Sequence, residues 1–451
     1  MSKRVNFGSR LAIVLATAGS AVGLGNVWRF PYMTGENGGA AFLLLYVGCI
    51  FLLGLPGMVS EFIVGRHAQS NAARAYDQLS GGRPWKLVGY LGILTSTIIL
   101  GFYAVVAGWC LQYLFVSLAG QLQGDADYVR QYFGTFTSSV WQPVVCGVAF
   151  VFITHWVIVR GVKKGIERAS KLLMPLLLIL LVVLVVASCS LPGAMEGVKF
   201  LLMPDFSKLN GSVLFDALGQ AFFSLSLGTA CLCTYASYFP HQVSLVNSAK
   251  QIALLDTLIA LLAGLMIFPA AASVGISPDS GPSLIFITLP NVFQQAFGAL
   301  PAVGYTVSVM FYALLVFAAL TSTISMHEIG TAFFCEEFHL PRSKAAWILT
   351  SIASVICLFC AWSVGAFTGI QLMGFQLMDF CDRLTANLLL PLGSMLTCLF
   401  VGWYIPRQVV FDEFTNGGTR HLRLFRVHMF SVRYVCPVCI LLVFLRQLGV
   451  I

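Results

Sequence analysis

Three glycines, an asparagine and an arginine interrupt one apolar stretch of the sequence, "GSAVGLGNVWRFP" (19–31). Glycine in a helix interior costs about 1 kcal/mol relative to alanine, and an arginine at bilayer depth costs at least about 2.5 kcal/mol. A helix that breaks here would free backbone carbonyls on one side of the break and N–H groups on the other. Because carbonyls suit a cation and N–H groups suit a carboxylate, this stretch could bind a zwitterion together with a metal cation.

The alternative for Gly19 and Gly23 is close helix packing, since small residues four apart often form helix–helix contacts. Asn26 and Arg29, which follow at once, favour a binding site. A second apolar stretch, "GQAFFSLSLGTACLCTYASY" (219–238), is interrupted in the same way by Gly228 and by serines and threonines. Two spans interrupted at corresponding positions of two halves are a sequence indication of a transporter binding site.

The elements that position these residues must be membrane helices. The chain is 58% hydrophobic and 10% charged, which is far less charge than a soluble domain carries. Its apolar runs reach the about 20 residues that span a bilayer and lack the alternation of barrel strands. We therefore predict an all-α integral membrane protein. Eleven transmembrane helices are expected, at about 10–36, 40–65, 87–118, 142–159, 171–189, 212–238, 244–273, 305–335, 345–362, 369–402 and 429–448.

These spans suggest a single transporter domain over residues 1–451, with two five-span halves that are interrupted in spans 1 and 6; the family resemblance given below implies that the halves form a 5+5 inverted repeat with broken helices 1 and 6. Repeat one would cover about 10–189, repeat two about 212–402, and one extra helix about 429–448. Of the 26 Lys and Arg residues, 20 fall in one set of loops, which the positive-inside rule assigns to the cytoplasm. The N-terminus is then cytoplasmic and the C-terminus periplasmic or extracellular.

The net charge of +8 reflects this asymmetry, and no nucleic-acid partner is expected. The C-x-x-C pair Cys436 and Cys439 has no histidine or second pair nearby, which favours packing over a metal or redox site. Converging nucleophiles, acids or metal ligands are also missing from the sequence, so we expect no enzyme. A passive channel would need a continuous polar pore, whereas the polar residues here concentrate at one depth.

The two interrupted stretches, with "ENGGAAF" (36–42) and "TYASY" (234–238), resemble the neurotransmitter:sodium symporter family, in particular its bacterial amino-acid transporters of eleven spans. The resemblance covers essentially the whole chain and implies that family's inverted repeats and broken helices. It also implies two sodium sites. The first sodium site would contain Ala21, Asn26, Ser224 and Asp256, and the second Gly19, Val22, Ala318, Thr321 and Ser322.

A substrate site is implied between the two broken helices. Its residues would be Ala21, Leu24, Gly25, Ile99, Tyr103, Phe223, Ser224, Ser226, Thr229, Ser322 and Met326. Two alternatives stay open: Thr321 and Ser322 could bond to carbonyls of their own helix, and Tyr103 could be a packing residue. Because Thr229 and Ala230 are small, the pocket should accept a hydrophobic amino acid, with large or aromatic side chains favoured.

The resemblance further implies a gate on each side of this site. The outer gate would pair Arg29 with Asp379, below which Phe223 forms a lid. Asp379 could instead pair with Arg383 on its own helix, and Asp382 is a further acidic candidate.

The inner gate would pair Arg4 with Glu336, helped by Phe7 and Tyr238. An ordinary positive-inside anchor is the alternative for Arg4. Glu61 would accept N–H groups of the unwound first span.

We therefore expect sodium-coupled symport of a hydrophobic amino acid across the inner membrane by alternating access. Another small amino acid or an amine carried by the same mechanism is the alternative, and a passive channel is less favoured. Asp256 would supply the negative charge that chloride supplies in some relatives, so chloride is not expected. After sodium leaves, Asp256 could take up a proton, or it could simply bond to a neighbouring helix. His327 and Glu328 receive no role from the sequence.

Overall fold

The computed structural model describes residues 6–122, 126–275, 284–297 and 300–447. Within these ranges the regular structure is helical apart from one short hairpin, in which β1 (Gln371–Leu372) pairs antiparallel with β2 (Phe375–Gln376). The prediction of an all-helical membrane protein is thus confirmed with this small exception.

Nine helices in the described ranges are long and apolar enough to cross a membrane, and a tenth span results if a helix pair bent by 55° is counted as one. The nine unbroken spans follow in chain order, and some of them consist of several helical segments. They are α3 (Ala40–Cys49) with η2 (Ile50–Gly54) and α4 (Leu55–Ala68); α6 (Lys86–Leu118); α8 (Gln142–Val159); η3 (Val162–Glu167) with α9 (Arg168–Cys189); α13 (Leu245–Ser273); α15 (Pro301–Glu337); α16 (Arg342–Val364); α17 (Leu377–Arg383) with η6 (Leu384–Leu389), α18 (Leu390–Leu399) and η7 (Phe400–Tyr404); and α20 (Leu422–Phe430) with η8 (Ser431–Val435) and α21 (Cys436–Gln447).

The bent pair is the interrupted first span. Helix α1 (Arg10–Ala21) ends at the glycine-rich stretch, and the chain resumes as the π-helical η1 (Gly25–Arg29) and α2 (Phe30–Glu36). A β-carbon on Gly23 would lie 2.5 Å from Oγ of Ser322 and 3.1 Å from the hydroxyl of Tyr103. Glycine is therefore required at this position because side chains of α15 and α6 approach the backbone.

The second interrupted stretch forms α11 (Gly211–Ser224) and α12 (Cys231–Ala236), separated by six non-helical residues. Ser226, Gly228 and Ala230 all have positive φ angles in this gap (53°, 81° and 61°), which no α-helix can contain. Each helical piece is shorter than the 18 residues needed to count as a span, so the number of eleven spans and the inverted repeat stay predictions.

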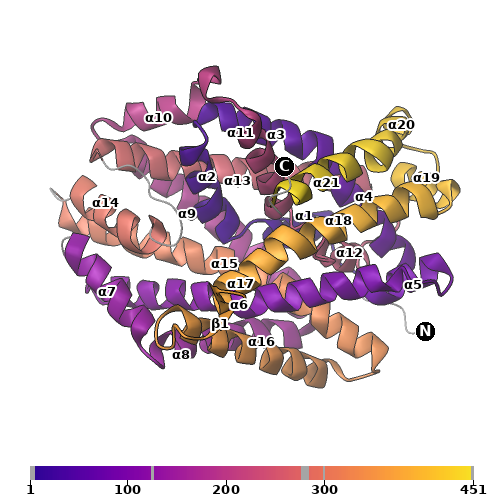
Figure 1. Ribbon diagram of the computed structural model, residues 1–451, viewed down its shortest axis with the longest axis horizontal. Helices are drawn as coiled ribbons and strands as arrows, with labels where there is room; N and C mark the ends of the chain where they lie inside the picture. Colours follow the sequence, from indigo (N-terminus) through magenta and orange to yellow (C-terminus); the bar gives the residue numbers. More distant parts are fainter. Residues whose placement is uncertain (1–5, 123–125, 276–283, 298–299, 448–451) are drawn as a thin grey trace.

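Shorter helices connect the spans at the two ends of the molecule. They are α5 (Ala72–Ser80), α7 (Ala126–Ser138), α10 (Ala194–Leu202), η4 (Phe206–Lys208), η5 (Leu284–Thr288), α14 (Leu289–Ala296) and α19 (Arg407–Thr415). In Figure 1, α7 and α14 lie at the left end and α5 and α19 at the right end, with α6 running between them. Helix α1 is surrounded, since it packs against α9, α13 and α15.

Candidate functional site

A cluster of buried polar side chains lies where the two broken helices meet α3 and α13. Nδ2 of Asn26 donates to Oδ1 of Asp256 at 2.8 Å and approaches Oγ of Ser224 at 3.4 Å. The Ser224 hydroxyl donates to Oδ2 of Asp256 at 2.7 Å. Tyr46 of α3 completes the cluster, with its hydroxyl 3.0 Å from Ser224 and 3.3 Å from Asp256.

This cluster contains three of the four residues expected at the first sodium site, and Ala21, the fourth, is the buried last residue of α1. Asn26 and Asp256 are fully buried, and Ser224 is 2% exposed. Amide, hydroxyl and carboxylate oxygens are the ligands of hard cations, and the single carboxylate balances one positive charge. The donor set therefore fits sodium as a co-transported ion.

The residues expected at the second sodium site also come together, on the other side of the first break. Oγ of Ser322 donates to the Val22 carbonyl at 3.2 Å, and Oγ1 of Thr321 lies 3.5 Å from the same oxygen. Thr321 also bonds within its own helix, to Ala318 at 3.0 Å, which is the alternative left open by the sequence. A β-carbon on Gly19 would lie 3.2 Å from Cβ of Thr321, so α1 and α15 are in close contact here.

The expected substrate residues lie next to the breaks. The Leu24 N–H donates to the Tyr103 hydroxyl at 3.1 Å. Gly25 faces the ring of Phe223, because a β-carbon at Gly25 would come within 2.9 Å of Cε1. On the second break, the Ser226 hydroxyl donates to the Ser20 carbonyl at 3.1 Å.

Thr229 uses its hydroxyl for the local backbone. Its Oγ1 donates to the Ser226 carbonyl at 2.7 Å and accepts from the Cys231 N–H at 3.2 Å, a local turn just before α12. Ile99 is buried and Met326 is partly buried. The Thr229 oxygen is therefore already engaged by the local backbone, and the place of this side chain in the substrate pocket stays a prediction.

A cavity of about 410 Å³ opens beyond Phe223 and reaches α17. Its lining residues are Leu24, Gly25, Trp28, Arg29, Tyr32, Met33, Phe102, Tyr103, Val106, Phe223, Met378, Asp379 and Asp382. It thus contains four of the expected substrate residues and both members of the expected outer gate. Ile99, Ser226, Thr229, Ser322 and Met326 do not line it.

Arg29 covers Phe223 at the bottom of this cavity. Its guanidinium lies 4.3 Å from the centre of the Phe223 ring, a cation–π contact. Arg29 has no ion pair within 4.0 Å to any residue that the structure describes. Arg383, the local alternative partner of Asp379, lies over the Phe375 ring at 4.4 Å. The gate is thus separated in this conformation, and the pairing of Arg29 with Asp379 stays a prediction.

The opposite side of the site is closed by aromatic packing. The Phe7 N–H donates to the Tyr238 carbonyl at 3.1 Å, and the two rings meet edge to face with centroids 5.9 Å apart. Arg4 of the expected inner gate lies outside the described residues. Its expected partner Glu336 accepts a 2.7 Å hydrogen bond from the backbone N–H of Asn71.

Glu328, which received no role from the sequence, forms an ion pair on this side. Its carboxylate binds both terminal nitrogens of Arg342 and accepts a 2.7 Å hydrogen bond from the Tyr238 hydroxyl. The neighbouring His327 bonds to Thr331 and Thr350 at 3.0 and 2.9 Å. Glu328 therefore joins α15 to α16 and to the chain after α12, while His327 serves interhelical packing.

Glu61 lies beside the second break. Its Oε1 accepts a 2.7 Å hydrogen bond from the N–H of Gly228. The expectation from the resemblance placed this contact on the first unwound span, and the structure corrects it to the sixth. The positive φ angle of Gly228 interrupts the helix, so its N–H has no helical carbonyl to bond to. The buried carboxylate of Glu61 accepts this hydrogen bond instead.

Two residues of the site had no local signal in the sequence. Tyr46 lies in "AAFLLLYVG" (40–48), where a tyrosine looks like one more apolar residue, and Ser20 lies between the glycines. The described residues hold no group of three or more His, Cys, Asp or Glu that could bind a metal, and the described cysteines are free thiols.

Long apolar helices that enclose two unwound segments, with buried oxygens gathered at the breaks, define a multi-pass membrane protein of the secondary transporter class. Comparison with known proteins agrees with this class. The model of the Sodium:neurotransmitter symporter family matches residues 4–131 and 126–450. The chain belongs to this family: it is a sodium-coupled transporter and not an enzyme.

Relatives match over most or all of this chain. An uncharacterized sodium-dependent transporter of Bacillus subtilis is 39% identical over 100% of this chain and 99% of its own. One from Methanocaldococcus jannaschii is 33% identical over 89% and 82% of the two chains. The crystal structure of MhsT in complex with L-phenylalanine has a TM-score of 0.89 and 41% identity, covering 99% of this chain and 100% of that one.

Proposed function

We propose that this sodium-coupled transporter carries a hydrophobic amino acid, with large or aromatic side chains favoured, into the cell across the inner membrane. The main support is the polar cluster of Asn26, Ser224 and Asp256 at the meeting point of the two breaks. Such a cluster offers oxygens to a cation beside the N-terminal end of a broken helix segment, whose partial positive charge suits the substrate carboxylate. The similarity to a structure that holds L-phenylalanine supports the choice of substrate.

Two sodium ions would bind with the substrate, one at each of the two predicted sodium sites described above. Substrate would enter through the 410 Å³ cavity and lie beneath Phe223, with its carboxylate at Leu24, Gly25 and Tyr103. Arg29 would close over it by approaching Asp379 or Asp382. Release would require the packing of Phe7 on Tyr238 to separate. The N-terminus would be cytoplasmic, and the first and second repeats would move relative to each other.

The test is uptake by proteoliposomes that contain the purified chain. Labelled phenylalanine, leucine, alanine and tyramine are offered with an inward sodium gradient and with the gradient replaced by choline. We expect uptake of phenylalanine and leucine that requires the sodium gradient. Preferred uptake of tyramine would refute the amino-acid substrate, and equal uptake without the gradient would indicate a passive channel.

A further inference from the structure

Helix α19 and helix α20, the first segment of the last membrane span, pack against each other at one end of the molecule, at the right of Figure 1. Aromatic side chains join them: the Phe425 ring meets those of Phe411 and Phe414 at 5.1 and 5.8 Å, and His428 stacks on Phe414 at 4.7 Å. These ring contacts, called the aromatic seam below, hold the two helices together. A groove lies beside Phe411 and Phe425 of the seam.

The groove has arginines on both walls. It encloses about 400 Å³ and is lined by Arg407, Gln408, Phe411, Leu422, Phe425 and Arg426. Arg407 comes from α19 and Arg426 from α20, and both are exposed. The guanidinium of Arg407 lies 5.8 Å from the centre of the Phe425 ring, so the aromatic seam forms the floor below it.

The positive charge of this groove is not balanced by the protein. Arg407, Arg423 and Arg426 are exposed and form no ion pair within 4.0 Å to a described residue. Elsewhere at the same end of the molecule, Arg66 and Arg74 are paired with glutamates. The groove therefore carries positive charge from arginine side chains without ion-pair partners among the described residues, which an anionic ligand would neutralise.

Neighbouring aromatic side chains place the groove on the aqueous side of the membrane interface, next to the layer of lipid headgroups. Trp403 and Tyr434 are 57% and 48% exposed and meet edge to face at 5.5 Å, as in the aromatic belts of membrane proteins. Val427 and Phe430, which lie between Arg426 and Tyr434, are exposed apolar residues that suit contact with the interfacial region of the bilayer. Arg426 precedes Tyr434 by eight residues, about 12 Å along the helix, which is beyond the aromatic belt.

We propose that this groove binds the phosphate of an anionic phospholipid, with Arg407 and Arg426 holding the headgroup and Leu422 contacting its glycerol or acyl region. A guanidinium binds phosphate oxygens in a bidentate manner, and basic clusters directly at the end of a membrane helix attract anionic lipids. A bilayer supplies this ligand in constant excess beside the exposed apolar face of α20, which favours a lipid over an acidic protein segment or a second copy.

The experiment counts the lipids retained by the purified full-length chain. Protein is equilibrated in detergent with equal amounts of phosphatidylglycerol and phosphatidylcholine, and bound lipids are counted by native mass spectrometry. We expect wild type to prefer phosphatidylglycerol, and Arg407→Gln with Arg426→Gln to reduce that preference on the order of tenfold. The matched control, Lys164→Gln with Arg168→Gln, removes two exposed charges from η3 and the first turn of α9 and should keep the preference.

Charge-conserving variants separate binding from folding. Arg407→Lys with Arg426→Lys keeps both charges but not the bidentate contacts, so it should retain only part of the preference. If the glutamine pair does not fold, the single variant Arg407→Gln replaces it and should also lose preference. No preference in wild type, or an equal loss in the Lys164/Arg168 control, would overturn the proposal. Displacement of the lipid by excess inorganic phosphate would show a site for free phosphate instead, and a charge-dependent dimer peak would indicate a second copy.

Discussion

Asn26 and Asp256 are 230 positions apart in the sequence, and their side chains meet at 2.8 Å between the unwound first span and α13. The second oxygen of Asp256 accepts from Ser224 at 2.7 Å. Both carboxylate oxygens are thus engaged, and the residue is fully buried. A carboxylate in this position is costly without a cation, which is why we assign its charge to sodium binding.

The first prediction concerns chloride. Because Asp256 would supply a fixed negative charge beside the first sodium site, uptake by wild type should be equal in chloride and in gluconate. Asp256→Asn removes this charge and should reduce uptake at least about tenfold or make it depend on the anion. Initial rates in proteoliposomes measure both. Chloride-dependent uptake by wild type would contradict the assignment.

The second prediction concerns the second sodium site. Thr321→Ala with Ser322→Ala removes two hydroxyls that approach the Val22 carbonyl, and it should raise the sodium concentration for half-maximal uptake by about tenfold or more. The control is Thr323→Ala on the same helix, since this buried hydroxyl contacts Thr154 of α8 at 2.8 Å instead. A sodium response in the double variant equal to that of the control would show that the site is misplaced.

Sequence and structure agree where the signal is local. The breaks follow from residues that a membrane helix tolerates poorly, such as Gly23, Asn26 and Gly228, and their positions could be predicted. The contacts of Tyr46 and Glu61 could not, because they depend on helix packing between residues 210 and 167 positions apart. The separation of Arg29 from Asp379 depends on the conformation of the transporter, which no sequence pattern specifies.

The third prediction concerns substrate size. Thr229→Phe should reduce uptake of phenylalanine more than uptake of alanine, because a bulky side chain there would fill the pocket. The same change removes the hydrogen bonds of Oγ1 to the Ser226 carbonyl and the Cys231 N–H, which costs on the order of 1 kcal/mol. Thr229→Val separates the two effects, since it lacks the hydroxyl and keeps the size. Competition assays with both substrates measure the ratio, and an equal loss for both in Thr229→Phe would place the side chain outside the pocket.

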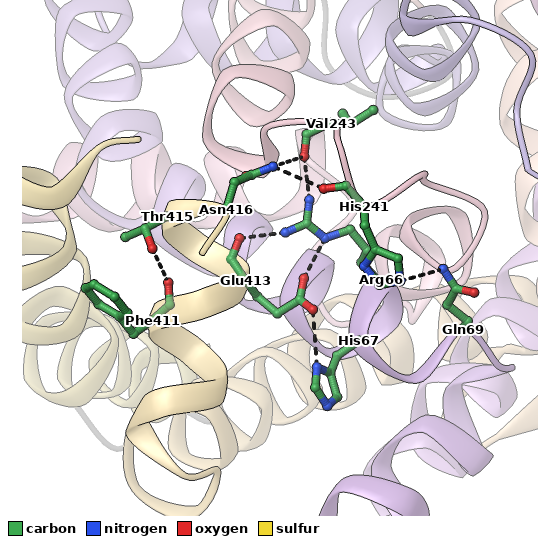
Figure 2. A network of polar contacts seen from close by, with 9 residues as sticks. All are labelled: Arg66, His67, Gln69, His241, Val243, Phe411, Glu413, Thr415 and Asn416. Atoms are coloured by element: carbon green, nitrogen blue, oxygen red, sulfur yellow. Dashed lines mark hydrogen bonds and ion pairs between the residues drawn. The ribbon is translucent and has the colours of Figure 1, made fainter. Parts of the chain in front are cut away.

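The last prediction concerns the polar network of Figure 2, in which Arg66 of α4 contacts Glu413 of α19 and the backbone of Val243. Nε of Arg66 contacts Oε2 of Glu413 at 2.5 Å, and its other nitrogens donate to the carbonyls of Glu413 and Val243. His67 lies 3.2 Å from Oε1 of Glu413. Burial alone would raise the pKa of Glu413, but His67 and Arg66 together hold it below its ordinary value of 4.5.

A carboxyl group whose pKa is lowered by folding stabilises the folded state above its unfolded pKa, and this contribution is lost as the pH falls through the folded value. Glu413→Gln should therefore destabilise the protein by about 3 kcal/mol at pH 7, since Arg66 then loses its counter-charge. Towards pH 4 and below, the melting temperatures of the variant and of wild type in detergent should converge. Asp412→Asn, a neighbouring exposed acid, should leave the melting temperature unchanged. A difference between Glu413→Gln and wild type that stays constant from pH 7 to below pH 4 would mean that the carboxylate charge does not hold α19 against α4.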